Sequence, residues 1–519
     1  MLFECVVLVV SFPVITRIVF FQSSKQKLIS FLVSICLTCD NDDDMTIDMM
    51  ANIGVECEKS SDCKIGNKFS YLSSCKKCCF VVTILLAILS LILTFMFIFF
   101  FDFLIKIINL APGTTHLNDT NRNIFELIES RGFQYESHFL NTGNGYIIQL
   151  VRIINPYSSS DILPPPVFLQ HGFQTNGNQW LINRNGYLDT NGDYYEMDPD
   201  NNDELIIDKN ESTCSSLGFV LANRGYDVWL GNYRGSIYST NHTTLDIHSA
   251  EFWSFSIDNL VDEDLKSTID YVRNMTNRKS ISYVGHSQGA FMMFALLAKH
   301  PEYSDYIRPF IALAPVFYMS KMELGLMNLF PMSLMEKLLR IYPREFPMFR
   351  KLIILLSNCC ENILYNRICF AYLHLLNGYR YEESYKDRVG IYVNNIVTGS
   401  SSWNVAHFLQ IIMANGQPRH FDFFDDQLNG QHYDGRIRAP EYNASNIRSQ
   451  HIAIVYSPID KLNAMVDIEK LKSTLNVKLM DDYMLPENVS HIGMIWSKDA
   501  GQLINKRIVQ ILTRYYNEP

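Results

Sequence analysis

Ser287 stands between two glycines in the stretch "GHSQG", a spacing that can expose a serine hydroxyl for nucleophilic attack. The apolar residues 281–284 before it predict a buried strand, and the apolar residues 291–298 after it predict the start of a helix. G-x-S-x-G between a strand and a helix is typical of a nucleophile elbow, whose tight turn leaves no room for side chains at Gly285 and Gly289. Because this short motif also arises by chance, its surroundings must decide the interpretation.

A nucleophilic serine needs a histidine as base and a carboxylate that orients the histidine, and after an elbow of this kind the acid comes first in the chain. Residues 452–456, "IAIVY", predict a strand that leads into "SPID", so Asp460 follows the carboxyl end of that strand. Residues 477–484 predict a further strand, and His491 in the loop after it is the one histidine that follows Asp460. Three other acids compete with Asp460 for the role: Asp467, Asp481 and Asp482.

The oxyanion that forms when a serine attacks an ester needs backbone donors fixed in advance. The N–H of Gln288, directly after Ser287, is the first expected donor. Residues 167–170 predict a strand, and the N–H of Phe173 in the loop "HGF" after it is the second. These residues together predict ester hydrolysis by a Ser-His-Asp triad through an acyl-enzyme that water resolves.

The chain of 519 residues is long enough for one large α/β domain with appendages. Its net charge of −10 and the absence of a long Lys/Arg run argue against a nucleic-acid partner.

Residues 183–212 form an acidic stretch that resembles a calcium loop, but Tyr194 stands where the sharp turn requires glycine, so a solvated surface loop is expected. We expect neither a metal nor a cofactor, since the spacing of the amino-terminal cysteines is poor for zinc: Cys57, Cys63, Cys75 and Cys78.

Residues 80–101, "FVVTILLAILSLILTFMFIFFF", carry no charge and would span roughly 33 Å as a helix, enough to cross a bilayer. A buried core helix is the alternative, but such a helix normally has a polar face. More lysines flank the segment before it than after it, which predicts a signal anchor with residues 1–79 in the cytosol and residues 112–519 in a lumen, endolysosomal for example, or outside the cell. All glycosylation sequons follow the segment, in agreement with this type II topology: Asn118, Asn210, Asn241, Asn274, Asn443 and Asn488.

The amino-terminal segment leaves two points open. Residues 28–39 resemble the hydrophobic region of a signal peptide, whose cleavage would conflict with an anchor, whereas a start at Met45 or Met49 would remove the conflict. A cluster of cysteines at the cytosolic membrane edge is compatible with S-palmitoylation and equally with reduced thiols: Cys75, Cys78 and Cys79.

From about residue 118 to the end, the chain resembles the acid lipase family, which includes gastric and lysosomal acid lipases. The matching stretches are "GYIIQLVRI", "PVFLQHGF", "GYDVWLGNYRG", "EFWSFSIDNLVDEDLKSTIDYV" and "YVGHSQGA", with the Asp460 and His491 contexts. The resemblance implies an α/β-hydrolase core with a mostly parallel sheet and an inserted helical cap over about residues 317–435. It implies hydrolysis of triacylglycerol or cholesteryl ester at a membrane or droplet interface. It also implies a cap disulfide between Cys360 and Cys369, with Cys359 as a competing partner.

The chain departs from the family pattern beside the expected site. Phe173 stands where leucine is usual, Tyr233 replaces a small serine, and Gly493 stands where an aspartate is usual. Pro458 and Ile459 replace two glycines before the acid. None of these changes removes a triad residue, but they leave two other functions open: a non-catalytic ectodomain that binds a lipid or a protein, and an acyltransferase that uses the same acyl-enzyme.

Overall fold

The computed structural model describes residues 118–158, 165–198, 204–209, 213–323, 331–347, 360, 363–395 and 398–517. The chain divides into two units between Gly113 and Thr114, and the described residues belong to the second unit. The predicted anchor at residues 80–101 and the segment before it lie outside the described residues. Within the described ranges, no helix is both long and apolar enough to cross a membrane.

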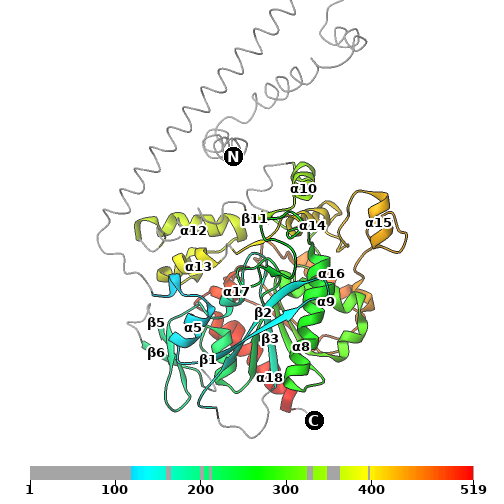
Figure 1. Cartoon of the computed structure of the whole chain (residues 1–519). Helices are drawn as coiled ribbons and strands as arrows, with labels where there is room; N and C mark the ends of the chain where they lie inside the picture. The colour runs from blue at the N-terminus through cyan, green and yellow to red at the C-terminus, as the bar shows by residue number, and fades with distance from the viewer. Residues whose placement is uncertain are drawn as a thin grey trace, which may run out of the picture. The chain divides into compact units, whose positions relative to one another are not determined.

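A nine-stranded sheet forms the centre of the molecule, in the order β1-β2-β7-β3-β9-β10-β13-β14, with β8 paired to β2 (Figure 1). The strands from β7 to β14 run parallel, whereas β2 is antiparallel to β1, β7 and β8. Parallel strands end at the same edge of a sheet, so the loops that follow β3, β9 and β13 are brought together. The strands comprise β1 Gln134–Asn141, β2 Tyr146–Ile154, β3 Pro166–Gln170, β7 Asp227–Leu230, β8 Asn241–His242, β9 Ile281–His286, β10 Ile307–Leu313, β13 Ile452–Tyr456 and β14 Asp481–Met484.

Strand residues point alternately to two hydrophobic cores, one on each face of the sheet. In β3, for example, Val167 and Leu169 belong to the core beneath α5, α6 and α18, whereas Phe168 belongs to the core beneath α8, α9 and α16. The parallel strands are therefore buried on both faces, which explains their nearly continuous apolar sequences. These helices are α5 Ile124–Ser130, α6 Leu217–Asn223, α8 Lys266–Thr276, α9 Gln288–Lys299, α16 Met465–Thr474 and α18 Lys506–Asn517.

Most of the remaining helices lie between β10 and β13, where the sequence predicts a cap. In Figure 1, α10, α12, α13, α14 and α15 gather above one end of the sheet. A disulfide joins Cys360 to Cys369, whose Cα atoms lie 5.8 Å apart, while Cys359 lies outside the described residues and the buried Cys214 has a free thiol. The elements are α10 Met332–Ile341, β11 Glu345–Phe346, α12 Ile363–Asn377, α13 Val389–Asn395, β12 Ser400–Ser401, α14 Ser402–Met413 and α15 Asp426–His432.

The acidic stretch at residues 183–212 is not simply a solvated loop, so that expectation is wrong. β4 Gly186–Leu188, β5 Tyr194–Asp198 and β6 Glu204–Ile207 form a small antiparallel sheet. The Glu196 side chain is completely buried and accepts hydrogen bonds from the backbone N–H groups of Ser215 (2.6 Å) and Ser216 (2.9 Å). The donors just before α6 offset the cost of burying this carboxylate.

One predicted strand is also shorter than expected. Residues 477–484 were expected to form a strand, but β14 begins only at Asp481. The neighbouring β13 begins at Ile452, and in the parallel register Ala453 pairs with Asp481, so residues before this point have no strand beside them. Length along a sheet edge is set by the partner strand, which the local sequence does not reveal.

Candidate active site

Ser287 lies in the turn between β9 and α9 with backbone angles of φ 55° and ψ −116°. This positive φ is strained for a residue with a side chain and is held because buried elements continue on both sides. A Cβ atom at Gly289 would lie 2.6 Å from the carbonyl oxygen of Gln170, and one at Gly285 would lie 2.8 Å from the backbone nitrogen of Ala290. The elbow packs so closely against β3 and α9 that only glycine fits these two positions.

The structure brings Ser287, His491 and Asp460 together from three separate loops. His491 precedes α17 Gly493–Trp496, and its Nε2 atom lies 2.9 Å from the Oγ atom of Ser287. Its Nδ1 atom lies 2.7 Å from the Oδ2 atom of Asp460. All three side chains are buried, with Ser287 retaining the largest exposed fraction, 9%. Hydrogen bonds of this length between such groups are strong because water does not compete for them.

The Asp460 carboxylate is fixed through both of its oxygens. Its Oδ1 atom accepts hydrogen bonds from the backbone N–H groups of Leu462 (2.9 Å) and Asn463 (3.0 Å). Oδ2 is thereby aimed at Nδ1 of His491, and with a proton on Nδ1 the other ring nitrogen can accept a hydrogen bond from the Ser287 hydroxyl. The three rival acids have other partners: Asp467 accepts from Ser320, Asp481 binds Arg507, and Asp482 binds Lys472.

The two expected oxyanion donors flank the nucleophile. Gln288 is the first residue of α9, and the loop that contains Phe173 passes beside Ser287, since a Cβ atom at Gly172 would lie 3.2 Å from the Ser287 Cβ atom. Over the described parts of the chain, neither the backbone N–H of Phe173 nor that of Gln288 donates to a protein acceptor. Both groups are therefore available to a negative oxygen formed at the serine.

Tyr233, one of the departures from the family pattern, braces this loop. Its hydroxyl donates a hydrogen bond of 2.8 Å to the carbonyl oxygen of Gly172, and its ring centre lies 4.2 Å from that of His171. The Nδ1 atom of His171 lies 2.9 Å from the same carbonyl oxygen and therefore carries a proton. Burial lowers the pKa of His171 to about 3, so the ring stays neutral near pH 7.

Contacts from the cap segment to this loop and to the elbow were missed by sequence reasoning. The backbone N–H of Thr398 donates to the carbonyl oxygen of Gln174 (3.1 Å), and the Asn404 side chain donates to the side-chain oxygen of Gln288 (3.2 Å). The rings of Phe408 and Phe173 meet edge to face with centres 5.5 Å apart. No motif marks these residues, because their partners lie more than one hundred positions away and only the fold brings them into contact.

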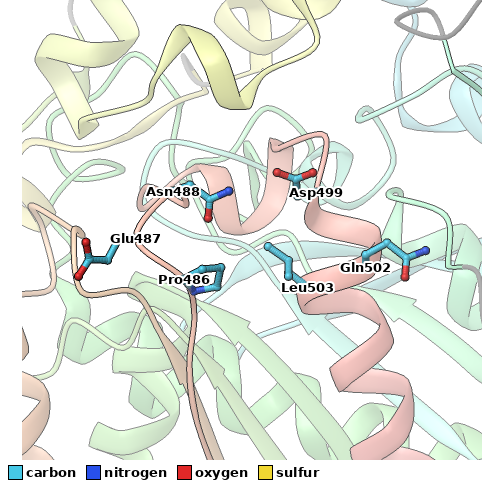
Figure 2. A pocket seen from close by; sticks show the side chains of 6 residues that line it. All are labelled: Pro486, Glu487, Asn488, Asp499, Gln502 and Leu503. Carbon is cyan, nitrogen blue, oxygen red and sulfur yellow. The ribbon is translucent and has the colours of Figure 1, made fainter.

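A separate hollow of about 560 Å³ lies on the segment that leads to His491, and Figure 2 shows its lining. It contains none of the three triad residues, but Asn488, a predicted glycosylation site, lines it.

Asn241, Asn274, Asn443 and Asn488 are exposed, whereas Asn210 and the side chain of Asn118 lie outside the described residues. Within the described ranges, no group of three His, Cys, Asp or Glu residues could hold a metal ion. The six residues that line the hollow are Pro486, Glu487, Asn488, Asp499, Gln502 and Leu503.

Comparison with known proteins agrees with this arrangement. Residues 124–184 match the family described as partial alpha/beta-hydrolase lipase region, and residues 165–354 match the alpha/beta hydrolase fold. The chain is 32% identical over 400 residues to a putative lysosomal acid lipase/cholesteryl ester hydrolase of Crotalus adamanteus, covering 76% of this chain and 91% of the relative. The chain belongs to the acid lipase family.

Two mammalian members of the acid lipase family show the same extent of similarity. The human lysosomal acid lipase/cholesteryl ester hydrolase is 30% identical over 405 residues, and the gastric triacylglycerol lipase of Bos taurus is 30% identical over 403 residues. In both cases the alignment covers 76% of this chain and 92% of the relative. As a family member with the α/β-hydrolase fold, this acid lipase homologue is a carboxylic ester hydrolase of the lipase/esterase class.

Proposed function

We propose that the protein hydrolyses neutral lipid esters, triacylglycerol or cholesteryl ester, with Ser287 as nucleophile, His491 as base and Asp460 as the orienting acid. The observation that carries this proposal is the pair of hydrogen bonds of His491, 2.9 Å to Ser287 and 2.7 Å to Asp460. A serine that has a strained backbone and a hydroxyl bonded to a histidine has the features of an activated nucleophile.

In this mechanism His491 takes the Ser287 proton through Nε2 as the hydroxyl oxygen attacks the ester carbonyl carbon. Asp460 accepts from Nδ1–H throughout and stabilises the imidazolium that forms. The N–H groups of Phe173 and Gln288 stabilise the oxyanion, each contributing about 3 kcal/mol to lowering the barrier. His491 then protonates the leaving alcohol, and a water molecule activated by the same histidine resolves the acyl-enzyme.

The proposed substrate class rests on the family and on the cap. The named relatives are cholesteryl ester hydrolases and triacylglycerol lipases, which supports an apolar ester over a small polar one. The helices between β10 and β13 support a cap over about residues 317–435, and α10 exposes several apolar side chains suited to a lipid interface: Leu334, Leu338 and Ile341. A cap of this kind can shield the site from bulk water while the ester is positioned.

For its location we propose a type II membrane protein, anchored by residues 80–101, whose hydrolase domain over residues 112–519 lies in an endolysosomal lumen or outside the cell. The charge distribution and the one-sided sequons support this topology. Four exposed sequon asparagines in the hydrolase domain support glycosylation there. Removal of N-glycans from the full chain should lower its apparent mass, and protease added to intact vesicles should leave the hydrolase domain protected. An unglycosylated, protease-sensitive domain would contradict the topology.

The catalytic proposal is tested with the full chain and its Ser287→Ala variant. We expect a fluorophosphonate probe to label the parent chain and not the variant, and emulsified trioleoylglycerol or cholesteryl oleate to release oleic acid only with the parent. Equal labelling of both proteins would refute the assignment of Ser287. An added alcohol that receives the acyl group in place of water would make the protein an acyltransferase, and an unlabelled parent would make it a non-catalytic binding protein.

A further inference from the structure

The loop that carries His491 is fastened on both sides of the histidine. The Ser457 hydroxyl donates to the carbonyl oxygen of Val489 (2.5 Å), and His286 lies against the His491 backbone, with Nε2 3.2 Å from the carbonyl oxygen. Between these two points stands Ser490, whose backbone N–H is also buried and requires an acceptor. The position of the histidine ring therefore depends on what accepts from Ser490.

That acceptor is Glu383, a buried carboxylate from the cap segment, at the end of the short 3₁₀ helix Tyr381–Glu383. Its Oε2 atom accepts from the backbone N–H of Ser490 (2.8 Å), and its Oε1 atom accepts from the backbone N–H of Arg380 (2.7 Å). The Glu383 carbonyl oxygen also accepts from the backbone N–H of Lys498 (2.8 Å), beyond α17. One residue thus joins the cap segment to the backbone on both sides of the histidine loop.

The Glu383 carboxylate lies against Gly493. A Cβ atom at Gly493 would lie 2.2 Å from the Oε2 atom of Glu383, closer than any two such atoms can approach. A side chain at position 493 would therefore require the Glu383 carboxylate to move away from Ser490. Glycine at position 493 leaves room for the Glu383 carboxylate, which comes from a segment 107 residues before Ser490.

We propose that Glu383 is a positioning residue for the reaction: it holds the Ser490 backbone so that the His491 ring stays within reach of Ser287. The inference rests on the proposed role of His491 as the base. Removing the carboxylate leaves the Ser490 N–H unpaired and frees the loop, and a displacement of about 1 Å at a catalytic group is enough to reduce turnover about 100-fold.

Burial raises the pKa of Glu383, whereas its hydrogen bonds with Ser490 and Arg380 lower it. If Glu383 is protonated, one of its oxygens becomes an O–H donor and the side chain accepts hydrogen bonds less well. For this reason kcat has to be measured across pH and not at one value. The charged and titratable groups around this carboxylate include Arg380 on the same element and Tyr379, whose own pKa burial raises well above its usual value.

The test compares five variants of the full chain: Glu383→Gln, Glu383→Ala, Gly493→Asp, the double variant E383A/G493D, and the matched control Glu382→Ala. Glu382 is the exposed neighbour of Glu383 in the chain. For each, kcat and KM are measured with a soluble p-nitrophenyl ester across pH, with the rate of fluorophosphonate labelling and the Tm. Ser287→Ala serves as the zero-activity reference.

We expect the kcat and the labelling rate of Glu383→Ala to fall about 10- to 100-fold, with KM within about twofold of the parent's. The kcat of Glu383→Gln should fall less, because the amide oxygen can still accept from one backbone N–H, although the NH₂ group then faces the other N–H. Gly493→Asp should fall similarly because two carboxylates collide. The double variant should recover at least about tenfold over either single change, since Asp at 493 enters the space that Glu383 vacates.

Several outcomes would overturn the proposal. One is a folded Glu383→Ala with kcat within about twofold of the parent, and another is a double variant no better than its single changes. If the Tm of both Glu383 variants falls together with their activity, Glu383 is a structural residue and not a positioning one. If instead Ser287→Ala is as active as the parent, the proposed catalytic triad fails, which is a separate result.

Discussion

Replacing Asp460 by asparagine tests the acid of the proposed triad, because it keeps the side-chain shape and changes one acceptor into a donor. Asp460 uses Oδ1 for the N–H groups of Leu462 and Asn463 and Oδ2 for the Nδ1–H group of His491. An asparagine can satisfy only one side. If its oxygen keeps the two backbone donors, its NH₂ group faces Nδ1 and moves the imidazole proton to Nε2.

With the proton on Nε2, His491 can no longer accept from the Ser287 hydroxyl, 2.9 Å away. Loss of the correct tautomer in a triad reduces kcat about 10⁴-fold, which corresponds to about 5.5 kcal/mol of barrier at about 1.4 kcal/mol for each factor of ten. We therefore expect Asp460→Asn to hydrolyse a soluble p-nitrophenyl ester about 10⁴ times more slowly than the parent, with a Tm within a few degrees of it.

The matched control is Asp482→Asn, which alters a rival acid that binds Lys472 on the surface and does not reach the site. Its kcat should equal that of the parent. Asp460 is not the acid of the triad if a folded Asp460→Asn keeps more than about one tenth of the parent's kcat, or if Asp482→Asn loses as much activity as Asp460→Asn.

Two further predictions concern the loop that follows β3 and contains His171 and Gly172. Burial lowers the pKa of His171 to about 3, against about 6.5 in an unfolded chain, so below about pH 6.5 the unfolded state binds the extra proton and stability falls as the solution becomes more acidic. His171→Gln should remove the share of this loss that His171 contributes, about 1.4 kcal/mol of unfolding free energy for each pH unit down to about pH 3. The buried His286 and His407, whose pKa values are also lowered by burial, keep their own shares, and His248→Gln at an exposed site should leave the slope unchanged. Urea unfolding at several pH values measures the slope, and identical slopes in His171→Gln and the parent would contradict the prediction. Tyr233→Phe removes one donor to the Gly172 carbonyl oxygen and leaves the His171 ring as the other near donor, so we expect a stability loss of about 0.5–1.5 kcal/mol and less than a tenfold fall in kcat. A greater fall in kcat at unchanged stability would mean that the hydroxyl acts in the reaction itself.

Local sequence was enough to predict the strands that carry the site. The apolar run at residues 452–456 forms β13 with the predicted bounds, and the predicted strand at residues 281–284 is extended by two residues in β9. Such strands are buried on both faces, so nearly every position must be apolar and the signal is strong. Edge elements carry weaker signals, which is why β14 was predicted too long and the sheet within residues 183–212 was not predicted.

The identities of the candidate catalytic residues also follow from the sequence. G-x-S-x-G requires glycine on both sides of Ser287, and the packing distances at Gly285 and Gly289 give the steric reason. Chain order then limits the base to His491 and the acid to a few candidates, because each catalytic group must follow a particular strand of the sheet.

Only the tertiary structure decided how these residues are held. The sequence shows a glycine at position 493, but not that Glu383 takes up the space beside it. It also gives no sign that Thr398 and Asn404 of the cap segment bind Gln174 and Gln288. Strand and turn preferences act over a few neighbouring residues, whereas these contacts join positions more than one hundred residues apart. Their partners are chosen by the packing of the whole domain, and so they become visible only when the chain is folded.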